Sequence, residues 1–170
     1  MLFRSYDDIG ANINQGSAYI FTRSGTTWTQ QAKLIASDGA TNDWFGIGVA
    51  IAGDTAIVGS YFDDVGTNVD QGSAYVFVRS GTTWKQQARL TSADGAASDG
   101  FGLSVSISGD TAVVGAYNDD IGSNADQGSA YVFTRSGTNW TQQAKLTAAD
   151  GAAVDWFGYA VMIEIGRAHV

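Results

Sequence analysis

An internal repeat of 56 residues is the feature that most constrains this chain. Aromatic residues recur at that spacing in three series: Tyr19, Tyr75 and Tyr131; Trp28, Trp84 and Trp140; Phe45, Phe101 and Phe157. Residues 73–107 and 129–163 are identical at 25 of 35 aligned positions. A repeat of this length predicts copies of one supersecondary unit that bury their apolar faces against each other.

Each unit has the pattern of four short β-strands. In the last complete copy we expect strands over residues 103–108, 111–117, 128–135 and 140–146, separated by Gly-Asp and Ser-Gly turns and by an acidic loop at 118–127. Trp140, Ala144 and Leu146 are predicted to share one face of the last strand. We expect no helix longer than one turn.

The third strand of the unit is apolar on both faces, with Tyr131 and Phe133 on one and Ala130 and Val132 on the other. A sheet covered on both faces by copies of itself is typical of a β-propeller blade. Small residues in the first strand (Gly48, Ala50 and Ala52) suit a crowded position near a central axis. The fold class predicted is therefore all-β, a partial β-propeller of four-stranded antiparallel blades; a linear β-solenoid is the alternative.

These motifs resemble the FG-GAP repeat family, the blade type of integrin α-chain propellers and of many bacterial surface proteins. The "FG" pair is Phe45-Gly46, Phe101-Gly102 and Phe157-Gly158, and the "GAP" position is Gly59-Ser60-Tyr61 and Gly115-Ala116-Tyr117. "SGDTAVVGA", "GSAYVF" and "W-x-QQAKL" are similar to the bacterial form of the repeat. The resemblance implies a propeller of about seven blades.

Integrin-type blades often carry an Asp-rich calcium loop between their first two strands. Here that link is residues 52–55 or 108–111, each with a single Asp. One carboxylate cannot supply the six to eight oxygen ligands that calcium prefers. The departure argues against the calcium site typical of integrins.

The repeat divides the chain into a partial blade at 1–44, blades at 45–100 and 101–156, and the first strand of a further blade at 157–163. We expect an open arc whose end faces are exposed and which aggregates or oligomerises. Tyr19, Ile20 and Phe21, with Val161 and Ile163, should then be less buried than Tyr75, Phe77, Val105 and Ile107. Residues 164–170 hold the only Glu and the only His, and we interpret them as a non-native read-through tail.

Calcium is the one cofactor for which the sequence offers candidate ligands. The acidic loop brings hard oxygen groups together in two copies, Asp63, Asp64, Asn68 and Asp70, then Asp119, Asp120, Asn124 and Asp126. The alternative is that Asp and Asn form Asx turns in a long loop. A second acidic cluster precedes each "FG" (Asp38 and Asp43, Asp94 and Asp99, Asp150 and Asp155), and we expect it to cap the turn between blades.

Aromatic residues offer two further candidates. Trp28, Trp84 and Trp140 should form cation–π contacts with Arg23, Arg79 and Arg135 across a hairpin, with sugar stacking as the alternative. Trp44 and Trp156 are replaced by Gly100 in the middle copy, which makes that position a candidate for uneven ligand contact.

Composition narrows the function classes. The net charge of −8 disfavours nucleic acid, and no apolar run is long enough for membrane insertion. Cys is absent, and outside the tail the general bases reduce to Asp, so we predict no enzyme activity.

We expect a non-catalytic extracellular or cell-surface module for binding or adhesion, from a bacterium, with a protein or glycan ligand on its loop face and neighbouring blades as structural partners. The alternatives are a purely structural spacer and an accessory part of a carbohydrate-active enzyme.

Overall fold

The computed structural model describes residues 2–164, with side chains from Tyr6 onward. Every regular element in that range is a β-strand, as predicted. The strands are β1 (Leu2–Ser5), β2 (Ser17–Ser24), β3 (Thr27–Leu34), β4 (Val49–Ala52), β5 (Thr55–Ser60), β6 (Ser73–Ser80), β7 (Thr83–Leu90), β8 (Phe101–Ser108), β9 (Thr111–Ala116), β10 (Ser129–Ser136) and β11 (Asn139–Leu146). No helix in this range could cross a membrane. All but one residue of the suspected tail lies outside it.

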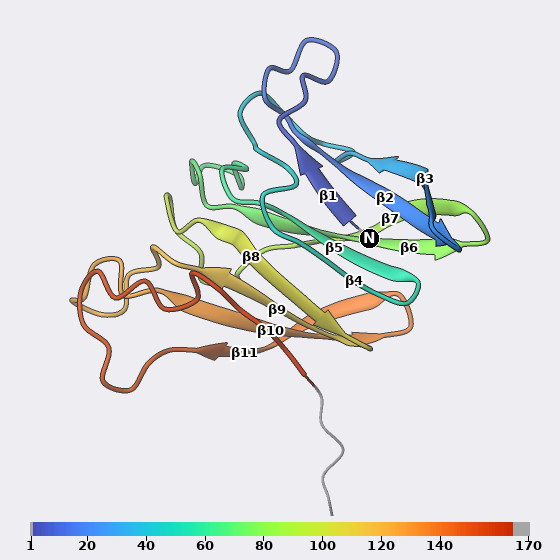
Figure 1. Ribbon diagram of the computed structural model, residues 1–170. Helices are drawn as coiled ribbons and strands as arrows, with labels where there is room; N and C mark the ends of the chain where they lie inside the picture. Colours follow the sequence, from blue (N-terminus) through green and yellow to red (C-terminus); the bar gives the residue numbers. More distant parts are fainter. Residues whose placement is uncertain (1, 165–170) are drawn as a thin grey trace, which may run out of the picture.

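The strands form three antiparallel sheets in the orders β1-β2-β3, β4-β5-β6-β7 and β8-β9-β10-β11. Figure 1 shows them following one another down the view in chain order. Because each four-stranded sheet is a simple meander within one repeat, each is one blade, called here the second and third blades; the three-stranded sheet is the first blade. The fold class predicted from the sequence is confirmed.

The blades pack face to face. Between the first and second blades, Ala18, Ile20 and Leu34 meet Tyr75 and Phe77 in one apolar core. One repeat further along, Ala74, Val76 and Leu90 meet Tyr131 and Phe133. Each blade thus presents small and aliphatic side chains to the next blade and aromatic side chains to the previous one.

The blades approach most closely along their first two strands. A Cβ atom added at Gly59 in β5 would lie 1.8 Å from the carbonyl oxygen of Gly102 in β8. At Gly48 it would lie 2.8 Å from the carbonyl oxygen of Leu103. Of the small residues predicted near the axis, Gly48 is therefore required by backbone-to-backbone contact between blades, and Gly59 in the second strand is required for the same reason.

The outer strand differs from the expectation. A β-bulge opposite Val132 and Phe133 inserts Gln143, so that Ala144 pairs with Val132 but Gln142 pairs with Phe133. The prediction that Trp140 shares a face with Ala144 and Leu146 is wrong, because one inserted residue reverses the alternation. The same bulge recurs in β3 and β7.

Burial at the two ends of the chain follows the prediction with one exception. Tyr19, Phe21, Val161 and Ile163 are only partly buried, whereas Tyr75, Phe77, Val105 and Ile107 are buried. Ile20 is also buried, at 2% exposure, because it lies on the face of β2 that packs against the second blade. Residues 157–163 form no strand ladder, since within the described range no counterpart of β5 or β9 is available to pair with them.

Candidate functional sites

The first aspartate of each acidic loop points into its own blade. Asp119 is buried at 5% exposure, and its Oδ2 accepts hydrogen bonds from Ser129 Oγ at 2.5 Å and Tyr131 Oη at 2.9 Å. Lys145 Nζ lies 2.7 Å from the same oxygen. Asp63 makes the same three contacts one repeat earlier, with Ser73, Tyr75 and Arg89. Asp7 repeats them at the first blade, where it is partly exposed.

The other loop residues close the loop on itself. Asp64 Oδ1 accepts the backbone N–H of Asp70 at 2.9 Å, and Asp120 accepts that of Asp126 at 2.8 Å. Asp70 and Asp126 have positive φ, 55° and 53°, a conformation that Asp tolerates better than most residues. The Asn68 side chain donates to Gln71 Oε1 at 2.8 Å and to the Gly95 carbonyl at 2.9 Å, and Asn124 does the same in its copy.

The eight predicted calcium ligands are therefore divided among three structural roles. Asp63 and Asp119 accept hydrogen bonds from side chains inside the blade. Asp64 and Asp120 close the loop by accepting the backbone N–H groups of Asp70 and Asp126. Asn68 and Asn124 use their amide N–H groups as donors. Across residues 2–164, no three acidic, His or Cys side chains are grouped as metal ligands. This geometry agrees with the alternative reading of the loops as hydrogen-bonded turns.

The second acidic cluster caps the turns between blades, as expected. Asp43 Oδ2 accepts the N–H of Ala40 at 2.5 Å, and Asp99 that of Ala96 at 2.7 Å. Burial, opposed in part by this hydrogen bond, raises the pKa of both Asp43 and Asp99 to about 6. Each lines an acidic cleft where two blades meet, with volumes of 360 Å³ at Asp43 and 290 Å³ at Asp99.

Lys145 and Arg89 bridge these clefts. Lys145 Nζ reaches Asp94 Oδ2, in the loop between blades, at 2.7 Å, while also pairing with Asp119 of its own blade. Arg89 joins Asp38 at 3.2 Å to Asp63 in the same manner. Since each cation neutralises carboxylates from both sides of the cleft, its repeated role is to hold adjacent blades together.

An arginine clamp lies at the turn where integrin-type blades often carry calcium. Arg135 Nε donates to Asp110 Oδ1 at 2.7 Å, and the Arg135 backbone N–H donates to the Asp110 carbonyl at 2.8 Å. Its guanidinium carbon lies 5.3 Å from the centre of the Trp140 ring. Arg79, Asp54 and Trp84 form the same clamp in the second blade. These groups do not fit a calcium site, because the only carboxylate of the turn is paired with a fixed cation.

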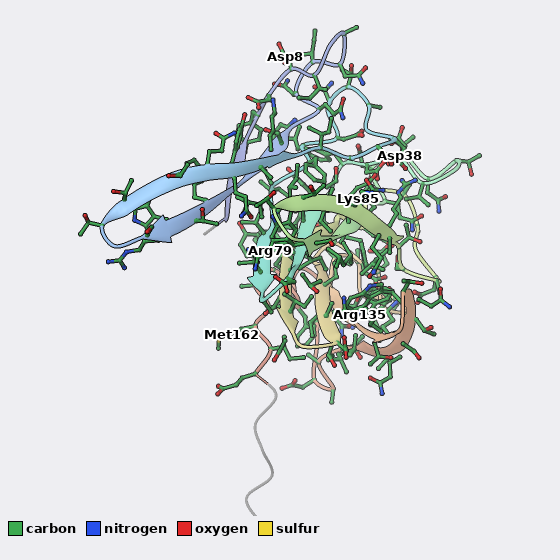
Figure 2. The ribbon with its side chains drawn as sticks, turned by 90° about the vertical axis from the view of Figure 1, so that its right-hand side faces the viewer. Asp8, Asp38, Arg79, Lys85, Arg135 and Met162 are labelled. Carbon is green, nitrogen blue, oxygen red and sulfur yellow. The ribbon has the colours of Figure 1, made fainter. Side chains whose placement is uncertain are left out.

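The predicted cation–π contacts are present in all three copies, including Arg23 over Trp28 at 5.9 Å. In Figure 2, Asp8 and Asp38 lie among the loops, above Arg79 and Arg135. Arg135 also donates to Thr55 Oγ1 of the preceding blade at 3.1 Å. The clamp therefore fixes a hairpin and touches the neighbouring blade at once.

The paired glutamines of the outer strand link blades in both directions, a role the sequence reasoning missed. Gln87 Oε1 accepts the indole N–H of Trp140 in the next blade at 3.1 Å. Gln142 Oε1 accepts the N–H of Ala93, in the preceding interblade loop, at 3.0 Å. The same bonds recur one repeat earlier, at Gln31 and Gln86. The "W-x-QQ" spacing could have signalled this, because adjacent strand residues point to opposite faces.

A row of aromatic rings crosses all three blades near the ends of β1, β5 and β9. We call it the aromatic ridge. Its neighbouring ring centres lie 3.9–6.4 Å apart. Tyr6, Trp156 and Tyr159 are about half exposed, at 51%, 46% and 59%. The members of the ridge are Tyr6, Trp44, Tyr61, Phe62, Tyr117, Trp156 and Tyr159.

The ridge collects positions at which the copies differ. Trp44 and Trp156 correspond to Gly100, and Tyr6 and Phe62 correspond to Asn118. Where Gly100 stands, a notch of 60 Å³ opens, lined by the rings of Tyr61, Phe62 and Tyr117 and by polar residues. From the sequence, only Trp44 and Trp156 were predicted to contact a ligand, because the ridge depends on how loops from separate repeats meet.

The repeats match the model of the FG-GAP repeat at residues 28–77, 84–133 and 140–166, together more than half of the chain. The protein belongs to the FG-GAP repeat family. The first two matched segments begin in an outer strand, β3 or β7, and end in the third strand of the following blade, β6 or β10. The family's sequence unit therefore spans two FG-GAP blades. FG-GAP repeats are in general structural modules without catalytic groups. No curated protein matches the chain.

Proposed function

We propose that this FG-GAP repeat module is a non-catalytic extracellular or cell-surface unit for binding or adhesion, whose protein or glycan ligand contacts the aromatic ridge. The observation that carries the proposal is that aromatic side chains from all three blades gather on one partly exposed surface, at positions where the copies differ, such as Trp44 and Trp156 against Gly100. Contacts within and between blades require the same residues in each repeat. A surface free of those requirements can vary, and exposed aromatic side chains are enriched where proteins bind ligands.

The chemistry of the ridge suits an uncharged or weakly polar ligand. Rings offer faces for stacking, and Asp70, Ser98 and Asn118 beside the notch offer hydrogen-bonding groups. The net charge of −8 disfavours anionic partners such as nucleic acid. Location outside the cell is part of the proposal and is supported by the resemblance to surface proteins.

Arrays of extracellular matrix proteins and of glycans, probed with the labelled chain, test the proposal. The informative variants are Trp44→Gly and Trp156→Gly, because Gly100 already occupies the equivalent position and Trp44 and Trp156 have positive φ, 53° and 54°, which Gly adopts without strain. We expect at least a tenfold weaker Kd for any array ligand. Lys85→Gln, on the exposed outer strand, is the matched control. Absence of any array ligand, or binding that both variants retain, would favour the structural spacer.

A further inference from the structure

The notch at Gly100 is the position of the aromatic ridge where one repeat lacks the side chain that the others carry. Gly100 has a φ of 65°, close to the 53° of Trp44 and the 54° of Trp156, so the backbone is alike and only the side chain is missing. The notch has a volume of 60 Å³, and the rings of Tyr61 and Tyr117 form part of its wall. It lies between the second and third blades, each of which has all four strands.

Three polar side chains also line the notch, those of Asp70, Ser98 and Asn118. None of these side chains has a hydrogen-bond partner among the described residues. Asp70 is half-buried, yet no cation within residues 6–164 pairs with its carboxylate. Burial and, after it, the negative charge of Asp64 raise the pKa of Asp70, as expected for a carboxylate without a counter-ion.

The equivalent space between the first and second blades is closed by the chain itself. There the side chains of Asn14 and Asn42 are joined by a hydrogen bond of 3.2 Å, and Trp44 occupies the position of the missing side chain. The counterparts of the two asparagines at the notch are Asp70 and Ser98, which do not contact each other through their side chains. The notch therefore lacks both the ring and the polar contact that complete the neighbouring junction.

The groups around the notch fit a primary ammonium ion. The ring centres of Tyr61 and Tyr117 lie 6.4 Å apart, so a cation between them would lie within about 6 Å of both, the range of cation–π attraction. An ammonium group has three N–H donors, and Asp70, Ser98 and Asn118 each offer an oxygen acceptor. A quaternary ammonium ion has no donor for these oxygens, and the carboxylate would repel an anion.

The charge around the notch also favours a cation. The notch shares Ser98 and Asn118 with the acidic cleft at Asp99. That cleft is lined by five aspartates and one lysine, Lys145, which is already paired with two of the carboxylates. Because carboxylates outnumber cations there, a positively charged group gains from the surrounding field as well as from direct contacts.

We propose that the notch receives the ammonium group of a lysine side chain from a protein ligand. The ammonium group lies between Tyr61 and Tyr117. It donates to Asp70, Ser98 and Asn118, while the methylene stem of the lysine lies against the adjoining rings. This inference rests on the proposed binding role of the aromatic ridge, and it selects a protein over a glycan as the ligand.

NMR titration of the isotope-labelled chain with short blocked peptides tests the proposal. The three peptides are glycine pentamers whose central residue is lysine, norleucine or trimethyl-lysine. At about 150 mM salt, where the Debye length is about 8 Å, general attraction to the acidic chain is reduced. We expect the lysine peptide to cause saturable shifts at residues 98–100 and at the Asn118 side chain. The other two peptides should bind about tenfold more weakly or not at all, because charge-assisted hydrogen bonds are lost.

Two variants copy the sequence of the first junction and should therefore preserve the fold. Asp70→Asn introduces the residue found at Asn14, and Gly100→Trp the residue found at Trp44. Each should weaken binding of the lysine peptide by about tenfold, the first by removing the charge and the second by filling the notch. Asp126→Asn is the matched control, since it makes the same change in the third blade, outside the notch. Its affinity for the peptide should equal that of the parent chain.

The outcomes separate this inference from the proposed function. Absence of saturable shifts, equal binding of the norleucine peptide, or retention of binding by both notch variants would refute the lysine site. Tighter binding of the trimethyl-lysine peptide would also refute it and assign the notch to quaternary ammonium groups. If an array ligand is lost with Trp44→Gly but kept by Asp70→Asn, the ridge binds ligands and the lysine site is wrong. If the lysine peptide binds as expected and no array ligand is found, the lysine site stands and the adhesion role is wrong.

Discussion

The three aspartates that begin the acidic loops form a series in which chemistry is constant and burial changes. Asp63 and Asp119 have side chains 7% and 6% exposed, while Asp7 is 27% exposed and pairs with Lys33, which is 40% exposed. Each accepts hydrogen bonds from one Ser, one Tyr and one cation. Substitution of the aspartate by Asn keeps the side-chain volume but removes the negative charge to which all three groups donate.

For Asp119→Asn and Asp63→Asn we expect a loss of about 3 kcal/mol in the free energy of unfolding. Removal of one member of a buried ion pair costs about 3–5 kcal/mol, and the remaining partner of Lys145, Asp94, reduces this figure. Asp7→Asn should cost less than about 1 kcal/mol, because solvent screens an exposed pair. In a chain of this length about 3 kcal/mol corresponds to a Tm lower by roughly 6–12 °C.

Two interpretations of the loops, as hydrogen-bonded turns or as calcium sites, can be separated by thermal and urea unfolding of the three variants. Each variant is measured with about 5 mM calcium, which suffices for a weak site, and again with a chelator. If the aspartates hold the blade together, the losses follow burial and are the same with and without calcium. If the loops bind calcium, as the sequence-based hypothesis holds, calcium raises the Tm of the parent chain and Asp63→Asn or Asp119→Asn abolishes that rise. Equal losses at all three positions would contradict the argument from burial.

Three other outcomes are expected. Arg135→Gln and Arg79→Gln should each lower the free energy of unfolding by about 1–2 kcal/mol, because a charge-assisted hydrogen bond and a cation–π contact are lost. In double-mutant cycles, Asp110→Asn should show coupling with Arg135→Gln and none with the control Lys85→Gln. Asp43 and Asp99 have folded-state pKa values of about 6, above the unfolded value, so the folded state keeps their protons to higher pH than the unfolded state does. The free energy of unfolding should therefore fall as pH rises from about 4 to 6. Asp99→Asn should reduce this pH dependence of the melting temperature, and an unchanged dependence would argue against burial of the acid. Gly59→Ala should lower the free energy of unfolding in urea by about 3 kcal/mol or more, because its Cβ would lie 1.8 Å from the Gly102 carbonyl oxygen. Gly53→Ala, in the open β4–β5 turn, should lower it by only about 1 kcal/mol, because the positive φ of 57° is the single source of strain there.

Local and periodic properties of the fold could be predicted from the sequence. The alternation of apolar residues, the Gly-Asp turns and the 56-residue period specify strands, hairpins and blades, since these depend on residues close in sequence and on one pattern repeated. The Arg–Trp contacts and the Asp43 and Asp99 caps were predictable for the same reason: their partners lie on one hairpin or within three residues.

Tertiary structure decided what depends on contacts between blades. The bulge at Gln143 reversed the faces of the outer strand, and no periodicity in a strand reveals one inserted residue. Asp63 and Asp64 are adjacent and chemically identical, yet one enters the blade and the other closes a loop. The aromatic ridge joins Tyr6, Tyr61 and Tyr117, which lie in separate repeats, and only the packing of one blade against the next brings such residues together.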